Sequence, residues 1–403
     1  MDVLVVFGTR PEAIKLAPVI AELRSRGPGI RTHVCVTAQH RHMLDQVLDW
    51  FGITPGFDLD LMKINQDICL LAGRILAGIG EVLDRVQADT VVVQGDTTTA
   101  MAAALAAFYR GVRVAHIEAG LRTHDLANPF PEELNRRIVS VAATQHFAPT
   151  RRAAEALIAE NVAPSSIHVT GNTGIDALAM TLGQRVSIQL PFDALGRIVL
   201  VTAHRRESFG GPFESMCRAL RTLADRNQDI QVVYPVHLNP NVRAPVNRLL
   251  AGHPRIHLLE PLRYEQFVHL MARAHLLLTD SGGVQEEAPF LGKPTLVMRE
   301  TTERPEAVEA GTARLVGTET NSIVRWCEVL LKDRSEYERM SHAGSPFGDG
   351  HASRRIVDAL MGRKTGGLPP PELAVPRALA APQTRQFAAA MYSVLQHALR
   401  GLP

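Results

Sequence analysis

The sequence predicts an α/β protein with two doubly wound domains in tandem. Short β-branched segments alternate with longer helical segments, which is the pattern of a parallel sheet built from βαβ units. The alternation weakens over residues 183–196 and then starts again. With 403 residues, the chain is long enough for each half to bury its own core. We therefore expect an N-terminal domain over residues 1–183, a link over 184–196 and a C-terminal domain over 197–362. Such domains bind ligands at the carboxyl ends of their strands, here in a cleft between the two.

The strands are predicted from short runs rich in Val and Ile. In the first domain we expect strands at Val3–Phe7, His33–Thr37, Thr90–Gln94, Arg113–Glu118, Gln145–Ala148 and Ile167–Thr170. In the second domain we expect strands at Ile198–Ala203, Ile230–Tyr234, Arg255–Leu259, His275–Thr279 and Thr295–Met298. Helices are predicted at Pro11–Arg26, Pro212–Asp225, Tyr264–Ala272, Gly282–Leu291, Ser322–Lys332 and Asp349–Met361, the last being a candidate to pack back on the N-terminal domain.

The C-terminal residues 363–403 differ in composition from the globular body. Lys364–Pro382 is rich in Pro, Gly and Ala, which is typical of a linker. Thr384–Leu399 has the spacing of an amphipathic helix, and the alternative is a loosely held tail.

Composition excludes several classes of protein. The 43 basic and 41 acidic residues leave a net charge of +2, so no overall field attracts nucleic acid or an anionic membrane. The four cysteines lack zinc-ligand spacing and fit a reducing compartment. No apolar run reaches the ~18 residues of a membrane span, and the N-terminus lacks the basic region of a signal peptide. These features predict a cytoplasmic protein without a metal site.

The first strand is followed by the turn Phe7-Gly8-Thr9-Arg10-Pro11-Glu12. Thr9 and Glu12 have the spacing of a capping box. Arg10 stands where a strand delivers ligand contacts, and the alternative is a solvated residue at a helix start. The turn is not a G-x-G-x-x-G fingerprint, so nothing indicates a dinucleotide cofactor.

Three carboxylates follow consecutive units of the first domain. Asp96 follows one predicted strand, Glu118 ends the next, and Glu132 stands after a Pro-rich turn. Each has a simpler interpretation, since Asp96 or Thr97 could cap a helix and Glu132 could belong to a plain helix start together with Glu133. If they converge, clustered carboxylates raise one another's pKa, so that one holds a proton while another accepts one.

Two polar segments of the second domain suit an anionic ligand. One strand runs into Ala203-His204-Arg205-Arg206, where the alternative for His204 is a buried structural residue. Another feeds Ser281-Gly282-Gly283 at a helix start, whose free N–H groups could hold a diphosphate. The alternative is a plain Gly-rich turn. Glu287, further along that helix, could accept two ribose hydroxyls, and Arg304 in the next polar loop could balance phosphate charge.

Together these segments resemble the non-hydrolysing UDP-N-acetylglucosamine (UDP-GlcNAc) 2-epimerase family of bacteria. The matching segments, in chain order, are FGTRPEAIKLAPV, TAQHRHMLDQVL, QGDTTTA, HIEAGLRT, NPFPEELNRR, VTAHRRESFG, VHLNPNV, SGGVQEEAPFLGKP and RETTERPEAV. An ordered set of this kind is more specific than any single motif. The resemblance implies two Rossmann-like domains in the glycosyltransferase-B architecture.

The resemblance also implies a reaction and its residues. UDP-GlcNAc and UDP-N-acetylmannosamine (UDP-ManNAc) interconvert without a cofactor, by elimination of UDP to a bound 2-acetamidoglucal and re-addition. Asp96, Glu118 and Glu132 would stabilise the cationic ring and move the proton, without an assignment of acid and base. The expected diphosphate contacts are Arg10, His204, Ser281, Gly282, Gly283 and Arg304. Lys15 matches the family's active-site lysine, Phe267 its uracil contact and Glu287 its ribose contact.

Further properties follow only from the resemblance. They are a homodimer, a role in surface polysaccharide synthesis, and a second UDP-GlcNAc bound as activator at Gln39 and His40. Three positions depart from the family pattern: Leu262 replaces a nucleotide-binding Gln, Ala127 replaces an aromatic residue, and His42 replaces a Gln or Glu. The alternatives are a glycosyltransferase of the same fold, a hydrolysing epimerase that releases free ManNAc, and a non-catalytic UDP-sugar sensor.

Overall fold

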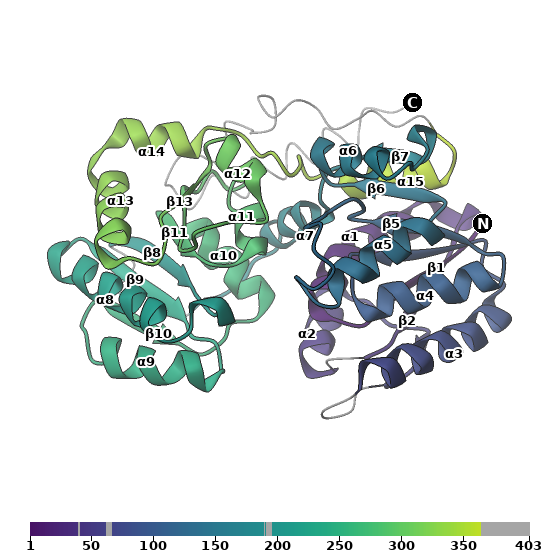
Figure 1. The fold of residues 1–403 in the computed structure, drawn as a ribbon, viewed down its shortest axis with the longest axis horizontal. Helices are drawn as coiled ribbons and strands as arrows, with labels where there is room; N and C mark the ends of the chain where they lie inside the picture. Colours follow the sequence, from purple (N-terminus) through teal and green to yellow (C-terminus); the bar gives the residue numbers. More distant parts are fainter. Residues whose placement is uncertain (39–40, 62–66, 189, 191–195, 364–403) are drawn as a thin grey trace. The chain divides into compact units, whose positions relative to one another are not determined.

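The chain divides into two compact units, each built around one parallel sheet (Figure 1). The computed structural model describes residues 1–38, 41–61, 67–188, 190 and 196–363. Of these, unit 1 holds Met1–Ala177 and 347–363, and unit 2 holds the described residues of Leu178–Pro346. The change of unit falls inside α7 (Thr173–Leu182), and the link expected over 184–196 follows that helix. The expected linker and helix over 364–399, and the activator contacts Gln39 and His40, lie outside the described residues.

Unit 1 contains a seven-stranded sheet in which all neighbouring strands are parallel. In spatial order the strands are β3 (Phe57–Asp58), β2 (Arg31–Val36), β1 (Asp2–Phe7), β4 (Thr90–Gln94), β5 (Arg113–Ile117), β6 (Gln145–Ala148) and β7 (Ile167–Val169). The helices of the unit, besides the start of α7, are α1 (Arg10–Ser25), α2 (Arg41–Phe51), α3 (Ile68–Val86), α4 (Thr98–Tyr109), α5 (Glu132–Ala142), α6 (Arg151–Ala159) and α15 (Ala352–Leu360).

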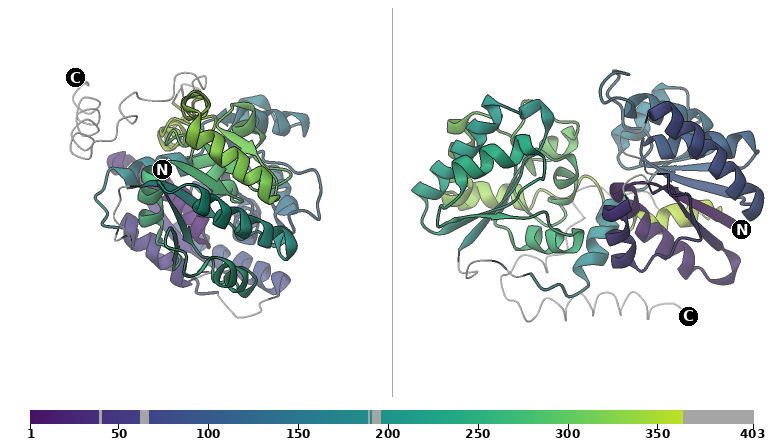
Figure 2. Two further views of the ribbon diagram at one scale, coloured as in Figure 1. Left: turned by 90° about the vertical axis from the view of Figure 1, so that its left-hand side faces the viewer. Right: turned by 90° about the horizontal axis from the view of Figure 1, so that it is seen from below.

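Helices cover both faces of this sheet because alternate side chains of each buried strand point to opposite faces. On β1, Val3, Val5 and Phe7 join a core with α1, α2 and α15. Leu4 and Val6 of the same strand join a second core with α3, α4 and α5. The sheet is therefore doubly wound. Figure 2 shows α15, coloured yellow-green, beside the purple α1, although the two helices are far apart in the sequence.

Unit 2 contains a six-stranded sheet that is also parallel throughout. Its strands, in spatial order, are β10 (Ile256–Leu259), β9 (Ile230–Pro235), β8 (Arg197–Thr202), β11 (Leu276–Thr279), β12 (Thr295–Val297) and β13 (Ala313–Leu315). Its helices, besides the end of α7, are α8 (Gly211–Arg226), α9 (Pro240–Leu250), α10 (Tyr264–Arg273), α11 (Gly282–Glu287), α12 (Pro305–Glu309), α13 (Thr320–Lys332) and α14 (Arg334–Ser341).

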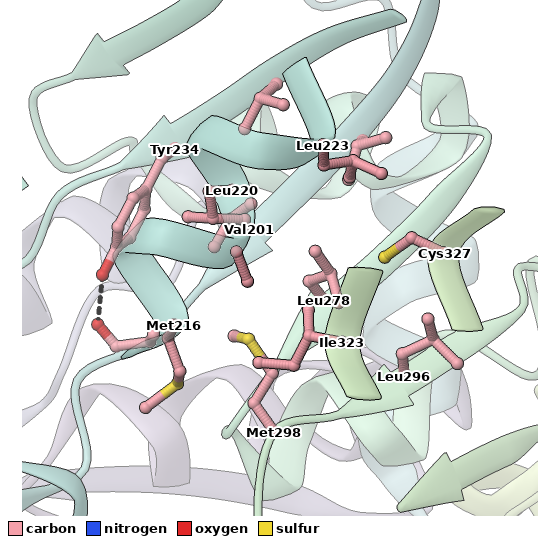
Figure 3. Packing of buried hydrophobic residues seen from close by; sticks show 14 of the residues in the cluster. Val201, Met216, Leu220, Leu223, Tyr234, Leu278, Leu296, Met298, Ile323 and Cys327 are labelled. Carbon is pink, nitrogen blue, oxygen red and sulfur yellow. Dashed lines mark hydrogen bonds between the residues drawn. The ribbon is translucent and has the colours of Figure 1, made fainter. Parts of the chain in front are cut away.

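The main core of unit 2 lies between one face of its sheet and helices α8, α9 and α13. Leu220 and Leu223 of α8 approach Val201 and Leu278 of the central strands, and Ile323 of α13 lies on the same side (Figure 3). The buried Tyr234 donates its hydroxyl hydrogen to the carbonyl oxygen of Ala203 at 2.6 Å, so its polar atom is satisfied within an apolar core.

The expected strands and most expected helices occur within one or two residues of their predicted ends, and the predicted α/β class is confirmed. Two helix ends were wrong. The helix expected over Asp349–Met361 begins at Ala352. The helix expected over Gly282–Leu291 ends at Glu287. Pro289 has no N–H with which to continue the helical hydrogen bonds. Every helix in the part of the chain that the structure describes is too short or too polar to span a membrane.

A buried carboxylate fixes the start of α15 within unit 1. Asp176 accepts hydrogen bonds from the backbone N–H groups of Ala352 at 3.1 Å and Ser353 at 2.7 Å. Burial raises the pKa of the Asp176 carboxyl to about 6, although these hydrogen bonds act in the opposite direction. The folded chain therefore binds a proton there at a pH at which an exposed aspartate, with a pKa of 3.8, is ionised.

This carboxyl predicts a pH-dependent term in stability. The contribution of proton binding is complete below about pH 4 and is lost as the pH rises through about 6, because the folded-state pKa is the higher one. We expect the free energy of unfolding of the wild type, relative to Asp176→Asn, to increase as the pH falls from about 7.5 to about 5. Urea unfolding followed by circular dichroism measures this difference. An Asp176→Asn difference that is the same at both pH values would contradict the assignment.

Candidate active site

The polar motifs of unit 1 meet at the carboxyl edge of its sheet. β1, β4 and β5 are neighbours in the sheet, and they end at Phe7, Gln94 and Ile117. The turns that follow them carry Arg10, Asp96 and Glu118. Because parallel strands end at one edge, residues far apart in sequence are brought to the same place.

A buried glutamate holds the first two of these turns together. Glu12 accepts hydrogen bonds from the N–H of Gly8 at 3.0 Å, the N–H of Thr9 at 2.8 Å and the hydroxyl of Thr97 at 2.7 Å. Burial raises the pKa of the Glu12 carboxyl, and the hydrogen bonds oppose this. The expected capping-box contact of Thr9 and Glu12 is present, and it also connects the β1 turn to the start of α4. Arg10 is half-buried at the first position of α1.

Asp96 does not cap the helix that follows it. Thr97 is the N-cap of α4 and accepts a hydrogen bond from the N–H of Ala100 at 3.0 Å. The carboxylate of Asp96 is instead paired with the guanidinium of Arg136 from α5. The side-chain amide of Asn135 donates to the backbone carbonyl of Asp96 at 3.0 Å. α5 therefore holds both the backbone and the carboxylate of Asp96 in place.

Glu118 is paired with Lys15, so the structure brings together two of the predicted site residues. The backbone of Glu118 has φ 64°, a left-handed conformation that non-glycine residues rarely adopt. Such conformations persist where the surrounding structure imposes them, and they concentrate at functional sites. His116 lies two residues before Glu118, on β5. Its Nε2 is 2.8 Å from the carbonyl oxygen of Gly95. Burial lowers the pKa of His116 to about 3, so this ring is neutral and supports the turn that carries Asp96.

The two adjacent acids at the start of α5 have different environments. Glu133 is fully buried and accepts hydrogen bonds from the N–H groups of Thr123 at 3.0 Å and His124 at 3.2 Å, and from Arg136 and Arg137. Glu132 is half-buried, and its carboxylate makes no hydrogen bond or ion pair with any residue that the structure describes. Glu132 and Arg136 are four residues apart and share one face of the helix. Glu132 is thus on the same face as the partner of Asp96.

In unit 2, the carboxyl edge carries the second group of predicted residues. β9, β8, β11 and β12 are consecutive in the sheet. After β8, the N–H groups of His204 and Arg205 both donate to the buried Asp280 at 2.7 Å. The His204 ring has its Nδ1 3.4 Å from the Asp280 carboxylate and stacks on His237 with 5.4 Å between centroids. Burial lowers the pKa of His204, and the nearby His237 and Arg205 also lower it. Asp280 acts in the opposite direction.

Gly282 lies next to the side chains of two arginines. A β-carbon on Gly282 would be 3.8 Å from Nη2 of Arg205 and 3.8 Å from Nη2 of Arg304. Arg304 is held by Glu286 of α11. The N–H of Ser281 donates to Thr279 Oγ1 at 2.9 Å, which orders the turn before Gly282. Ser281, Gly282 and Arg304 are therefore brought together, while Gly283 is exposed at the next position of α11.

The remaining predicted contacts lie on two helices of unit 2 and one loop of unit 1. Phe267 is half-buried on α10, and Glu287 is half-buried at the end of α11. Leu262 is half-buried just before α10, and Ala127 is exposed in the loop before α5. Among the residues for which coordinates are described, no group of three His, Cys, Asp or Glu side chains is arranged to hold a metal ion.

Comparison with known proteins decides the family. The family model for UDP-N-acetylglucosamine 2-epimerase matches residues 22–361. The chain belongs to the UDP-N-acetylglucosamine 2-epimerase family. The epimerase of Escherichia coli K12 is 53% identical over 374 residues, which are 90% of this chain and 99% of that protein. The epimerase of Bacillus subtilis is 51% identical over 363 residues, 90% of this chain and 95% of that protein.

A solved structure of the family supports the same conclusion. The Neisseria meningitidis epimerase, crystallised with UDP-GlcNAc bound, is 46% identical and aligns with a TM-score of 0.83. The alignment covers 90% of this chain and 100% of that chain. The family predicted from the motifs and the predicted α/β class are therefore confirmed.

Sequence reasoning missed two residues that organise the epimerase-family motifs. Arg136 binds Asp96, and Asp280 holds the backbone of the His204 turn. Arg205, which the sequence singled out only as part of a polar segment, approaches Gly282. Arg136 lies within a matching segment, and Asp280 directly precedes one. The spacing of Arg136 four residues after Glu132 on a predicted helix was the available signal, but its partner comes from another element.

Proposed function

We propose that this chain interconverts UDP-GlcNAc and UDP-ManNAc at C2 of the sugar, as the non-hydrolysing members of its family do. The observation that carries the proposal is the arrangement of acids at the carboxyl edge of unit 1. Asp96 and Glu118 are each paired with a cation, and Glu132 has no partner among the described residues. A reaction that moves a proton and stabilises a positive ring needs carboxylates in different states.

The chemistry requires the diphosphate to leave first, because a sugar C2–H is not acidic. As the bond between C1 and the UDP oxygen breaks, the ring gains oxocarbenium character, which nearby carboxylates stabilise. One acid then takes the C2 proton, and a C1–C2 double bond forms to give 2-acetamidoglucal and UDP. Return of a proton to the opposite face of C2, with addition of the UDP oxygen to C1, gives the epimer.

The ion pairs distinguish the roles of the three acids. Arg136 and Lys15 hold Asp96 and Glu118 in ion pairs, and we assign these two carboxylates to stabilisation of the cationic ring. Glu132 has no such partner among the described residues, and we assign it the exchange of the proton. Lys15 additionally balances Glu118 when the ring is neutral.

The nucleotide is assigned to unit 2. Ser281, Gly282, Arg304 and His204 surround the turn after β11, where guanidinium and N–H groups suit a diphosphate. Arg10, Gly283, Phe267 and Glu287 complete the proposed contacts, with uracil at Phe267 and ribose at Glu287. Leu262 lacks the amide of the family's Gln, so this nucleotide contact is missing. The further proposals are a homodimer, a UDP-GlcNAc activator at Gln39 and His40, and supply of UDP-ManNAc as a precursor of bacterial surface polysaccharide.

The experiment that tests the function is product analysis without added metal or NAD. Purified protein is incubated with UDP-GlcNAc, and the products are separated by anion-exchange chromatography. We expect UDP-ManNAc and no accumulation of UDP. Accumulation of UDP with free ManNAc would favour the hydrolysing epimerase, and an unchanged but bound substrate would favour a sensor or a glycosyltransferase.

A further inference from the structure

Arg205 and Arg304 reach one point from opposite sides of β11. Arg205 follows β8 and Arg304 follows β12, and these strands flank β11 in the sheet. β11 itself leads to Gly282. Nη2 of each arginine is 3.8 Å from the position that a β-carbon on Gly282 would occupy. An anion placed at this point would be attracted by both guanidinium groups.

The Glu303 carboxylate forms ion pairs with both arginines but accepts no side-chain hydrogen bond from either. Its carboxylate oxygens lie 3.8 Å from Nη1 of Arg205, 4.0 Å from Nη1 of Arg304 and 3.6 Å from Nη2 of Arg299. None of these distances is that of a hydrogen bond. The Glu303 side chain is also 40% exposed, so it can move into water without being buried elsewhere.

Two other acids bind arginines of this group through hydrogen bonds. Glu286 is hydrogen-bonded to Nε of Arg304 and is 5% exposed. Glu207 accepts from Nε of Arg299 at 2.6 Å, where Arg299 is 7% exposed and Glu207 is 52% exposed. Each of these acids binds one guanidinium group. The Glu303 carboxylate instead lies within 4.0 Å of all three without accepting a hydrogen bond from any of them, and Nη1 of Arg304 donates to the backbone carbonyl oxygen of Glu303 at 3.0 Å.

We propose that Arg205 and Arg304 form a two-guanidinium site for the diphosphate, and that Glu303 is an internal counter-ion which the diphosphate displaces. The inference rests on the proposed function, because it takes the nucleotide diphosphate as the ligand. Phosphate oxygens can accept paired N–H bonds from both arginines, which Glu303 does not do in the structure described here. Glu303 then lowers the affinity for UDP by competing for the same two cations.

The test is UDP binding by isothermal titration calorimetry at low ionic strength. Glu303→Gln keeps the size of the side chain and removes its charge. We expect the Kd for UDP to fall about three- to fivefold, the effect of removing one exposed competing charge. Glu300→Gln is the matched control. It removes a charge from the same loop, but Glu300 points toward Gly317, where a β-carbon would lie 2.8 Å from Oε1. We expect less than about a twofold change in this control.

A second variant tests Arg205 directly. Arg205→Gln is expected to raise the Kd for UDP about tenfold, as loss of a charge-assisted contact. In the double variant, Glu303→Gln should improve binding less than it does in the wild type, because half of the site is gone. If the wild type binds UDP and the Glu303→Gln variant binds it equally or more weakly, the counter-ion role of Glu303 is overturned. Failure of the wild type to bind UDP would overturn the proposed function and this inference together, and lack of epimerisation with tight UDP binding would overturn the function alone.

Discussion

Replacing Glu132 by Gln is expected to lower kcat for epimerisation by about a thousandfold, while the Kd for UDP changes less than about twofold. Glu132 makes no hydrogen bond or ion pair with a described residue, so removing its charge leaves no buried partner unsatisfied. The loss would therefore fall on proton transfer and not on the fold. Steady-state kinetics and calorimetric UDP binding, performed on one preparation, separate the two effects.

The adjacent Glu133 provides the control. Its fully buried carboxylate accepts from two backbone N–H groups and two arginines. Glu133→Gln removes the charge and one acceptor, and should destabilise the protein by about 2–3 kcal/mol. Urea unfolding should show this loss for Glu133→Gln and no loss for Glu132→Gln. Equal destabilisation by the two variants, or full activity of Glu132→Gln, would contradict the assignment of Glu132.

Replacing Gly120 by Ala is expected to destabilise unit 1 by about 3 kcal/mol. Gly120 follows Glu118 and Ala119 at the end of β5 and has φ +92°, which L side chains rarely adopt. A β-carbon there would lie 2.1 Å from the carbonyl oxygen of Ala153 in α6, and a backbone atom cannot rotate away. The shift would also move Glu118 from Lys15, so kcat should fall together with stability.

Gly73→Ala is the matched control for Gly120→Ala. Gly73 is exposed within α3, and nothing lies within 4 Å of a β-carbon placed on it. Because Ala favours a helix over Gly, this variant should be more stable by about 0.5–1 kcal/mol. Thermal unfolding of the two variants beside the wild type measures both changes. A Gly120→Ala protein that melts with the wild type would show that α6 can move away from β5.

The strands were predictable because strands buried on both faces are nearly continuous apolar runs. Thr90–Gln94 is such a run and has the bounds that the sequence predicts. Gln145–Ala148 also has its predicted bounds, although only Phe147 and Ala148 in it are apolar. The two-residue strand β3 and the strand β13 carry too few apolar residues for such a pattern, and neither was predicted. Their positions depend on pairing with β2 and β12.

The residues at the carboxyl edges were also predictable, since a motif after a strand must lie there. The ion-pair partners of these residues were not predictable. The sequence does not indicate that Asp96 pairs with Arg136 while Glu132, on the same helix as that arginine, does not pair. Likewise, His204 and Asp280 come from different strands, and only the order of the sheet brings them together. Pairing between elements is a tertiary property.

The central claim is that a proton at C2 is exchanged by the acids of unit 1. Proton NMR of the protein with UDP-GlcNAc in D₂O, without metal or NAD, tests it most directly. We expect UDP-ManNAc to appear with deuterium at C2, and Glu132→Gln to suppress this incorporation. Formation of UDP-ManNAc that retains the original hydrogen at C2 would contradict proton exchange, and with it the role assigned to Glu132.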